Sequence, residues 1–345
     1  MGSFVDVQTE AAALIGRLAE KCLQGEPLGT MSETMYCTAW VSMVQKKIDG
    51  SRFWLFPQSF QYLLDGQSSE GHWNHGDGVG DDIDDILITM ASLLSMLRHR
   101  NDTECRGCML ETAELDARVK YATAWLKHKL ERWDVSQTEH VAFEILVPTH
   151  LDLLRAEGVE FQFPGLQALT RLNTVKMAKF VPEILYGTSP TTLIHSLEAF
   201  VDKIDFDRLK HRLENGSMMY SPSSTAAYLM NASAWDDEAE AYLQMVLDKA
   251  EVSENGGFPP AYPSEVFELS WVSMDIYPIH RSTKPIQVLS TLLGAGFTPN
   301  DLGRSNVDLI ADRLELALSH GGGVVGFSMI PDLFPHNCAD GPISL

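Results

Sequence analysis

The residues best suited to chemistry lie in one stretch, Ser189 to Asn231. It contains T-T-L-I-H-S-L-E (Thr191–Glu198) and, further on, N-G-S-M-M-Y-S-P-S-S-T-A-A-Y (Asn215–Tyr228). The imidazole of His195 could exchange a proton near neutral pH or donate a hydrogen bond. Apolar residues recur beside it at helical spacing and predict a buried face: Leu193, Leu197 and Phe200. A lone histidine near a core often only satisfies a backbone carbonyl, so both interpretations of His195 stay open.

A run of acids, Asp81-Asp-Ile-Asp-Asp85, is the second candidate for chemistry. It contains D-D-x-x-D, which could hold magnesium, and D-x-D-D, which could supply a proton. Acids in the first turn of a helix also favour its macrodipole. Apolar residues then recur at helical spacing from Ile86 to Leu97. We therefore predict a helix N-terminus here, and we predict no metal-ligating residue.

The elements that position these residues are predicted to be helices. Period-two alternation is not sustained anywhere, and no glycine-rich phosphate loop or nucleophile elbow occurs. Residues 189–231 should form two helices, an acidic connector between them, and a polar turn into a third helix. Residues 46–56 should be a connector, and Pro148 should interrupt a buried helix. The other predicted helices are 5–24, 31–44, one starting at Pro57, 115–133, 140–154, 166–181, 236–250 and two within 288–320.

A glutamine and a tryptophan are spaced to join helices. Gln67-Ser-Ser-Glu-Gly-His-Trp73 has the pattern Q-x-x-x-G-x-W. We expect the Gln67 side chain to tie a helix end to the following loop while Trp73 packs across it. This arrangement is typical of stacked helices in an α-barrel.

Composition excludes several classes of function. The 345 residues carry a formal net charge of −21, which argues against nucleic-acid binding and anionic membrane surfaces. No apolar run is long enough for a membrane span, and the N-terminus lacks the pattern of a secretory leader. Five cysteines, including an isolated Cys105-x-x-Cys108, indicate free thiols in a reducing compartment, so we expect a cytoplasmic protein.

Seven motifs in order along the chain resemble the class II diterpene cyclases of plants and fungi, of the copalyl diphosphate synthase type. These motifs are Met31–Val44, Gly71–Trp73, Ile86–Leu97, His140–Pro148, Ser189–Glu198, Gly216–Ala227 and Gly256–Trp271. The resemblance implies an all-α fold in which an α-barrel γ domain accompanies part of a β domain. It assigns residues 1–50 to the first helices of the β-like domain and 51–271 to the γ-like barrel. Residues 272–345 would hold an insertion and a truncated remainder of the β-like domain.

The departures from this family concern its reacting groups. Where the family has P-D-x-D-D, the chain reads Pro-Asp332-Leu-Phe334-Pro335, so a phenylalanine stands at the position of the acid. The family's base histidine matches His195, but its asparagine partner falls at Pro260. Lys176 matches a lysine near the substrate diphosphate. Glu139 and Glu144 are the nearest counterparts of an acidic γ-domain motif, and Cys37 replaces an aspartate.

Three functions stay open at this stage. The chain could be an enzyme that closes rings of an oxidised diterpenoid without ionising it, by an intramolecular Diels–Alder step of the norbornene-forming kind known from fungal pathways. It could be a class II cyclase of geranylgeranyl diphosphate, the only case in which magnesium is expected; otherwise no cofactor is expected. It could be a non-catalytic relic or partner subunit. In the first two cases the partner is a small terpenoid, and the oligomeric state is not predicted.

The first hypothesis gives the candidate residues their roles. His195, Tyr36 and Tyr228 would donate hydrogen bonds or shape the substrate. Orientation of the reacting groups would supply most of the rate enhancement. The residues expected to contact substrate are Trp40, Lys176, Ser221, Trp271 and Phe334.

Overall fold

The structure is a computed structural model that describes residues 31–74, 82–105, 112–138, 140, 142–249 and 255–264. All of these except Tyr262–Ser264 belong to one compact unit that includes Met31–Ala261. Within that unit, no division occurs at the predicted boundary between residues 50 and 51. The assignment of residues 1–50 to a β-like domain therefore stays a prediction, and the boundary at 271/272 lies outside the described residues.

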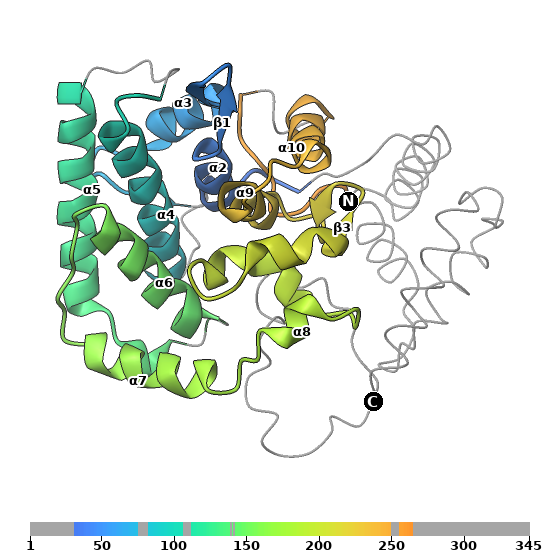
Figure 1. Cartoon of the computed structure of the whole chain (residues 1–345). Coiled ribbons are helices and arrows are strands. Elements are labelled where there is room, and N and C mark those ends of the chain that lie inside the picture. The colour runs from blue at the N-terminus through green and yellow to red at the C-terminus, as the bar shows by residue number, and fades with distance from the viewer. Residues whose placement is uncertain are drawn as a thin grey trace, which may run out of the picture. The chain divides into compact units, whose positions relative to one another are not determined.

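The described part is mainly helical, as predicted (Figure 1). Its elements are α2 (Met35–Ser42), β1 (Gln45–Ile48), β2 (Ser51–Trp54), α3 (Pro57–Gly66), α4 (Asp82–Asn101), α5 (Thr112–Arg132), η1 (Val135–Gln137), α6 (Phe143–Ala156), α7 (Leu166–Met177), α8 (Glu183–Tyr186), η2 (Thr192–Phe200), η3 (Phe206–Arg212), β3 (Leu213–Glu214), β4 (Ser217–Met218), α9 (Pro222–Asn231) and α10 (Asp237–Lys249), where η marks a 3-10 helix. No helix in the described ranges is both long and apolar enough to cross a membrane.

Helix α4 lies at the centre of the helical packing. It packs against α2, α5 and α6, and α2 packs in turn against α3 and α9. Apolar side chains of α4 are buried from Ile83 to Leu97, so little of this helix faces solvent. The helix begins at Asp82, which confirms the predicted N-terminus within the acidic run. One of these acids, Asp84, lies 3.0 Å from the His140 ring.

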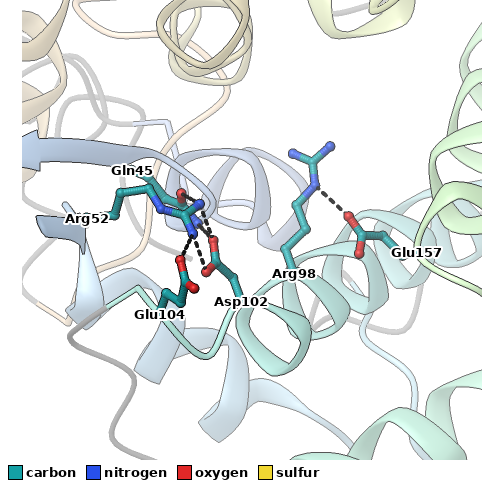
Figure 2. A network of polar contacts seen from close by, with 6 residues as sticks. All are labelled: Gln45, Arg52, Arg98, Asp102, Glu104 and Glu157. Atoms are coloured by element: carbon teal, nitrogen blue, oxygen red, sulfur yellow. Dashed lines mark hydrogen bonds and ion pairs between the residues drawn. The ribbon is translucent and has the colours of Figure 1, made fainter.

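Polar contacts fix the C-terminal end of α4 (Figure 2). Arg52 on β2 donates to both carboxylate oxygens of Asp102, at 2.7 and 2.9 Å, and Gln45 donates to the same carboxylate. One turn earlier, Arg98 lies 3.5 Å from Glu157, just beyond α6. These contacts join the β1–β2 hairpin and α6 to the same helix end.

The glutamine–tryptophan motif joins helices as predicted. The Gln67 amide donates to the carbonyls of Gly71 and Arg118, at 3.0 and 3.1 Å. Trp73 is buried, and its indole N–H donates to the Leu63 carbonyl at 2.7 Å. The end of α3, the following loop and α5 are thereby held together.

The prediction of a connector at residues 46–56 is wrong, because most of these residues lie in two strands. Strands β1 and β2 form an antiparallel hairpin, with Ile48 opposite Ser51. Asp49 and Gly50 both have positive φ, at 49° and 83°. Asp-Gly is a strong signal for this two-residue turn, but the strands are too short to show alternation.

The interruption predicted at Pro148 is also wrong, because α6 continues through it. A proline in a helix leaves the carbonyl four residues earlier without its usual N–H donor. That carbonyl belongs to Glu144, and the Asn173 side chain on α7 donates to it at 2.7 Å. The lost backbone bond is thus replaced by a bond from a neighbouring helix.

The helix predicted around His195 is a kinked 3-10 segment. Ser196 has non-helical angles, φ −138° and ψ 49°, in the middle of η2. The hydroxyl of Ser224 on α9 accepts from the Leu197 N–H at 3.0 Å and donates to the Ile194 carbonyl at 2.5 Å. A side chain from α9 therefore takes the place of the helical bonds at the kink.

Candidate functional site

Three elements bring the candidate residues together: α2, η2 and α9. Helix α9 packs against both α2 and η2. Helix α2 begins after Thr34, whose hydroxyl accepts from the Cys37 N–H at 3.2 Å. Helix α9 begins with Pro222 after the N-cap Ser221, whose hydroxyl accepts from the Ser224 N–H. Both starts use a hydroxyl side chain as the N-cap, and proline is favoured at the first position of α9.

Glu198 is a carboxyl group enclosed by this packing. It lies on η2 with 1% of its surface exposed, and the Ser223 hydroxyl donates to its Oε1 at 3.2 Å. Burial raises the pKa of Glu198 to about 7. The group therefore holds its proton for part of the time at neutral pH, unlike a carboxyl in water. Its Oε2 has no hydrogen-bond partner among the described residues.

Tyr36 on α2 lies next to this carboxyl group. Burial, and then the charge of Glu198, raise the pKa of Tyr36 well above its ordinary value. The Tyr36 hydroxyl interacts with this carboxyl group and with Trp40, although neither contact has good hydrogen-bond geometry. Burial likewise raises the pKa of Cys37 to about 11. Both groups stay protonated at neutral pH, so Tyr36 can donate a hydrogen bond and Cys37 is not a nucleophilic thiolate.

Trp40 and His150 extend the same buried region. The His150 ring on α6 lies 5.6 Å from the Tyr36 ring and 5.7 Å from the Trp40 ring, between ring centres. Nδ1 of His150 lies 2.8 Å from the Leu146 carbonyl. Nδ1 must therefore carry the proton, which makes Nε2 an acceptor in the neutral ring. Burial lowers the pKa of His150 to about 4, so the ring is neutral at physiological pH.

His195 is half-buried on η2, three residues before Glu198. Burial lowers its pKa to about 4. A neutral imidazole can donate one hydrogen bond and accept another. This state suits both the predicted role as a hydrogen-bond donor and a structural role.

Tyr228 and Ser221 hold elements together. The Tyr228 hydroxyl donates to Asp236 at 3.3 Å, and Lys210 lies 3.2 Å from the same carboxylate. Burial and the charge of Asp236 raise the pKa of Tyr228 to about 12. Ser221 is the N-cap of α9 and is fully buried. Contact of either residue with a substrate stays a prediction.

Lys176 lies outside the α2–η2–α9 region. Its ammonium group on α7 lies 3.1 Å from the buried carboxylate of Glu144 on α6. Trp271, Phe334 and Glu139 fall outside the described residues. Within the described ranges, no group of three or more His, Cys, Asp or Glu side chains is arranged to hold a metal ion. A role for Lys176 at a diphosphate therefore stays a prediction.

Sequence reasoning missed Glu198, Ser223 and His150 as members of this region. Glu198 stands inside the quoted motif, directly after Leu197 and before the apolar pair Ala199 and Phe200. A charged residue within an apolar run was a usable signal, since such residues are rarely fully buried unless paired. His150 gave a weaker signal of this kind, as a polar ring in the buried helix that contains Pro148.

Comparisons with known proteins define the class of this fold. No protein-family model matches the chain. The structure resembles abietadiene synthase from Abies grandis, with a TM-score of 0.63 and 22% identity over 88% of this chain and 36% of that one. It also resembles ent-copalyl diphosphate synthase from Arabidopsis thaliana, with a TM-score of 0.60 and 21% identity over 87% of this chain and 38% of that one. The fold is therefore that of the α-helical terpene cyclases.

Sequence relatives narrow this class. The chain is 45% identical to a pimaradiene synthase of Emericella nidulans, over 94% of this chain and 32% of the relative. It is 44% identical to a phyllocladan-16-alpha-ol synthase of Phomopsis amygdali, over 92% and 30%, and 39% identical to a copalyl diphosphate synthase of Talaromyces verruculosus, over 94% and 31%. The chain is homologous to diterpene cyclases over nearly its whole length, and it spans about a third of the length of these relatives.

Proposed function

We propose that this chain acts in terpenoid biosynthesis by folding a C20 terpenoid for ring closure. The observation that carries the proposal is the buried Tyr36 hydroxyl beside Glu198, where α9 packs against α2 and η2. A protonated hydroxyl in an apolar, water-excluded setting is a stronger hydrogen-bond donor to a substrate oxygen than the same group in water. Homology to diterpene cyclases supports a terpenoid as the substrate.

We further propose that the ring closes without ionisation of the substrate. The stretch that resembles the family's acid motif has Phe334 and Pro335 at two aspartate positions, and neither side chain can donate a proton. A Diels–Alder closure needs only a held conformation and a donor to the carbonyl of the dienophile. Two σ bonds form from π electrons within one molecule, so no oxidant, reductant or leaving group is required.

Tyr36 is the preferred donor among the three predicted candidates. The Tyr228 hydroxyl already donates to Asp236, whereas the Tyr36 hydroxyl makes no hydrogen bond of good geometry in the described part of the chain. His195 on η2 is neutral and carries one ring N–H, so it is a second candidate donor. The proposed site of action is the cytoplasm, since the buried Cys37 is a free thiol.

A second candidate is protonation-initiated cyclisation of geranylgeranyl diphosphate. The 45% identity to a pimaradiene synthase favours it. In this case the acid would come from a position other than Phe334 or from a second chain, and magnesium would be needed for the diphosphate.

Product analysis of the full chain separates these functions. The protein is incubated without metal with a diterpenoid aldehyde that carries a diene and a dienophile, and separately with geranylgeranyl diphosphate and magnesium. We expect faster and stereoselective closure of the aldehyde than in heat-inactivated protein. Conversion of the diphosphate alone to a bicyclic product would favour the second candidate. Turnover of neither substrate would contradict both.

A further inference from the structure

Four polar side chains form a series of contacts where α9 packs against α2 and η2. They are Trp40 and Tyr36 on α2, Glu198 on η2 and Ser223 on α9. The Tyr36 hydroxyl contacts both the Trp40 indole and the Glu198 carboxyl group. The Ser223 hydroxyl donates to Oε1 of Glu198 at 3.2 Å. Each of the four residues exposes 8% of its surface at most, so the contacts lie away from water.

The chemical types of these groups fix the direction of the contacts that Tyr36 makes. The indole N–H of Trp40 can only donate, so the Tyr36 oxygen is its acceptor. The hydrogen of the Tyr36 hydroxyl is then directed to the second contact, the Glu198 carboxyl group. The pKa of Tyr36 agrees with these directions, since the contact with Trp40 lowers it and the contact with Glu198 raises it. Glu198 and a substrate oxygen are therefore competing acceptors for one hydroxyl proton.

The protonation of Glu198 decides this competition. Burial raises the pKa of Glu198 to about 7, so both forms of the carboxyl group are populated at neutral pH. The ionised form accepts a charge-assisted hydrogen bond from Tyr36, which is roughly twice as strong as a neutral one. The protonated form lacks this charge and can donate its own proton to the Tyr36 oxygen. The hydroxyl proton of Tyr36 is then free to point at a substrate oxygen.

The other titratable groups around Glu198 do not replace it in this role. Cys37, its neighbour on α2, is protonated because burial raises its pKa to about 11. His150 on α6, which packs against η2, and His195 on η2 itself are neutral, because burial lowers the pKa of each to about 4. Helix α9 contributes an uncharged hydroxyl group. Glu198 is thus the group in this set whose charge changes near neutral pH.

We propose that Glu198 is a positioning residue whose ionised carboxylate holds the Tyr36 hydroxyl and whose protonated form releases it to a substrate oxygen. Glu198 acts through Tyr36 and not by contact with the substrate. The inference rests on the proposed function, in which Tyr36 donates to the carbonyl group of a terpenoid. It adds a regulation of that site by pH, with fast ring closure in mildly acidic solution and slow closure above neutral pH.

The pH profile of ring closure tests this role. In the wild type, kcat/KM for the diene–dienophile diterpenoid aldehyde should fall about tenfold between pH 6 and pH 8.5, because one hydrogen bond in the transition state is lost. Glu198→Gln keeps a neutral group at every pH, so its kcat/KM should stay within about twofold of the wild-type value at pH 6. Tyr36→Phe should be low at both pH values. Glu131→Gln, at an exposed position on α5, should keep the wild-type profile.

A second measurement needs no substrate. The full chain is labelled with carbon-13 at Cζ of its nine tyrosines, the atom that carries each hydroxyl group. One resonance, absent in Tyr36→Phe, should shift as the pH rises through 7 in the wild type and stay fixed in Glu198→Gln. If Tyr36→Phe fails to fold, the comparison of the wild type with Glu198→Gln still identifies this resonance.

The two measurements separate this inference from the proposed function. If the aldehyde is not converted, the proposed function fails, and the tyrosine resonance alone decides whether Glu198 holds the Tyr36 hydroxyl. If the aldehyde is converted and the pH profiles of the wild type and Glu198→Gln are the same, ring closure stands and the positioning role is overturned. A spectrum in which each tyrosine resonance responds to pH equally in the wild type and Glu198→Gln overturns it as well.

Discussion

Glu198 is buried as a carboxyl group whose pKa lies well above its ordinary value, at about 7. The folded chain therefore holds a proton that the unfolded chain releases above its ordinary pKa of about 4.5. The contribution of this group to the free energy of unfolding is fully present below pH 4.5 and is lost as the pH rises through 7. Glu198 thus makes neutral solution less favourable to the fold than mildly acidic solution.

Glu198→Gln should remove this dependence. The free energy of unfolding of the wild type, relative to the variant, should fall by about 2 kcal/mol between pH 5 and pH 7.5. Urea denaturation of both proteins at the two pH values measures the change. Glu131→Gln, at an exposed position on α5, should keep a constant difference from the wild type. Parallel pH curves for the wild type and Glu198→Gln would contradict the assigned pKa.

His99 should give a pH dependence of the opposite sign. Its ring is stacked between the rings of Trp54 and Phe60, at 3.6 Å between ring centres in each case. Its Nε2 lies 2.9 Å from the Ser42 carbonyl oxygen. Burial lowers its pKa to about 3. The unfolded chain binds a proton below the ordinary pKa of 6.5 and the folded chain does not, so stability is lost as the pH falls below 6.5.

His99→Phe keeps a ring in the stack and removes the titration. On going from pH 7 to pH 5, the wild type should lose about 2 kcal/mol more unfolding free energy than this variant. His128→Phe, at an exposed position, serves as the control. If the wild type and His99→Phe lose the same unfolding free energy between pH 7 and pH 5, the His99 ring is charged in the folded protein.

At the level of single residues, the sequence predicted that His195, Tyr36 and Tyr228 donate hydrogen bonds or shape the substrate. It did not predict which hydroxyl has a partner. Tyr36 and Tyr228 both stand in helical, apolar surroundings and both lie beside an acid, but only Tyr228 makes a hydrogen bond of good geometry, to Asp236 just before α10. That contact depends on how α9 and α10 pack, which no local pattern encodes.

The loop that follows α3 depends on Gln67 for its position. Gln67→Ala would leave the carbonyls of Gly71 and Arg118 without this donor. We expect a loss of about 1–3 kcal/mol in unfolding free energy by urea denaturation. Gln61→Ala, on an exposed face of the same helix, should change stability far less. Similar effects of the two changes would contradict the role of Gln67.

The kink of η2 depends on Ser224. Its hydroxyl bonds to both sides of the kink, at the Leu197 N–H and the Ile194 carbonyl. Ser224→Ala leaves two buried backbone groups without this partner, so thermal unfolding should occur several degrees lower, for a loss of about 1–3 kcal/mol. Ser69→Ala, on an exposed loop, is the control. A Ser224→Ala transition as high as that of Ser69→Ala would mean that the kink is held by other contacts.

At the level of elements, long periodic helices were predictable and the irregular ones were not. The first turns of α2 and α3 follow from local signals, an N-cap at Thr34 and a proline at Pro57. The continuation of α6 through Pro148 depends on Asn173 from α7, and the 3-10 form of η2 depends on Ser224 from α9. Both are tertiary contacts that override the local preference.

The whole molecule carries a large excess of negative charge. The sequence has 47 acidic and 26 Lys or Arg residues, for a net charge of −21. Such repulsion destabilises a compact state and is screened by salt. We expect the melting temperature at pH 7 to rise when sodium chloride is increased from low to moderate concentration. A fall would mean that ion pairs such as Arg52–Asp102 outweigh the repulsion (Figure 2).

The fold class of the molecule followed from helical periodicity and from the order of its motifs. The solved structures confirm the helical fold class, and the sequence relatives confirm the resemblance that the motifs carried. The way in which the chain would close a ring depends instead on the position of one hydroxyl group, that of Tyr36.

The rate of ring closure in two tyrosine variants tests this claim most directly. The full chain is assayed for stereoselective closure of the diene–dienophile diterpenoid aldehyde as wild type, Tyr36→Phe and Tyr228→Phe. We predict that kcat/KM falls about tenfold in Tyr36→Phe, the effect of one lost hydrogen bond in the transition state, and stays within about twofold in Tyr228→Phe. Equal rates for the wild type and Tyr36→Phe would contradict the account.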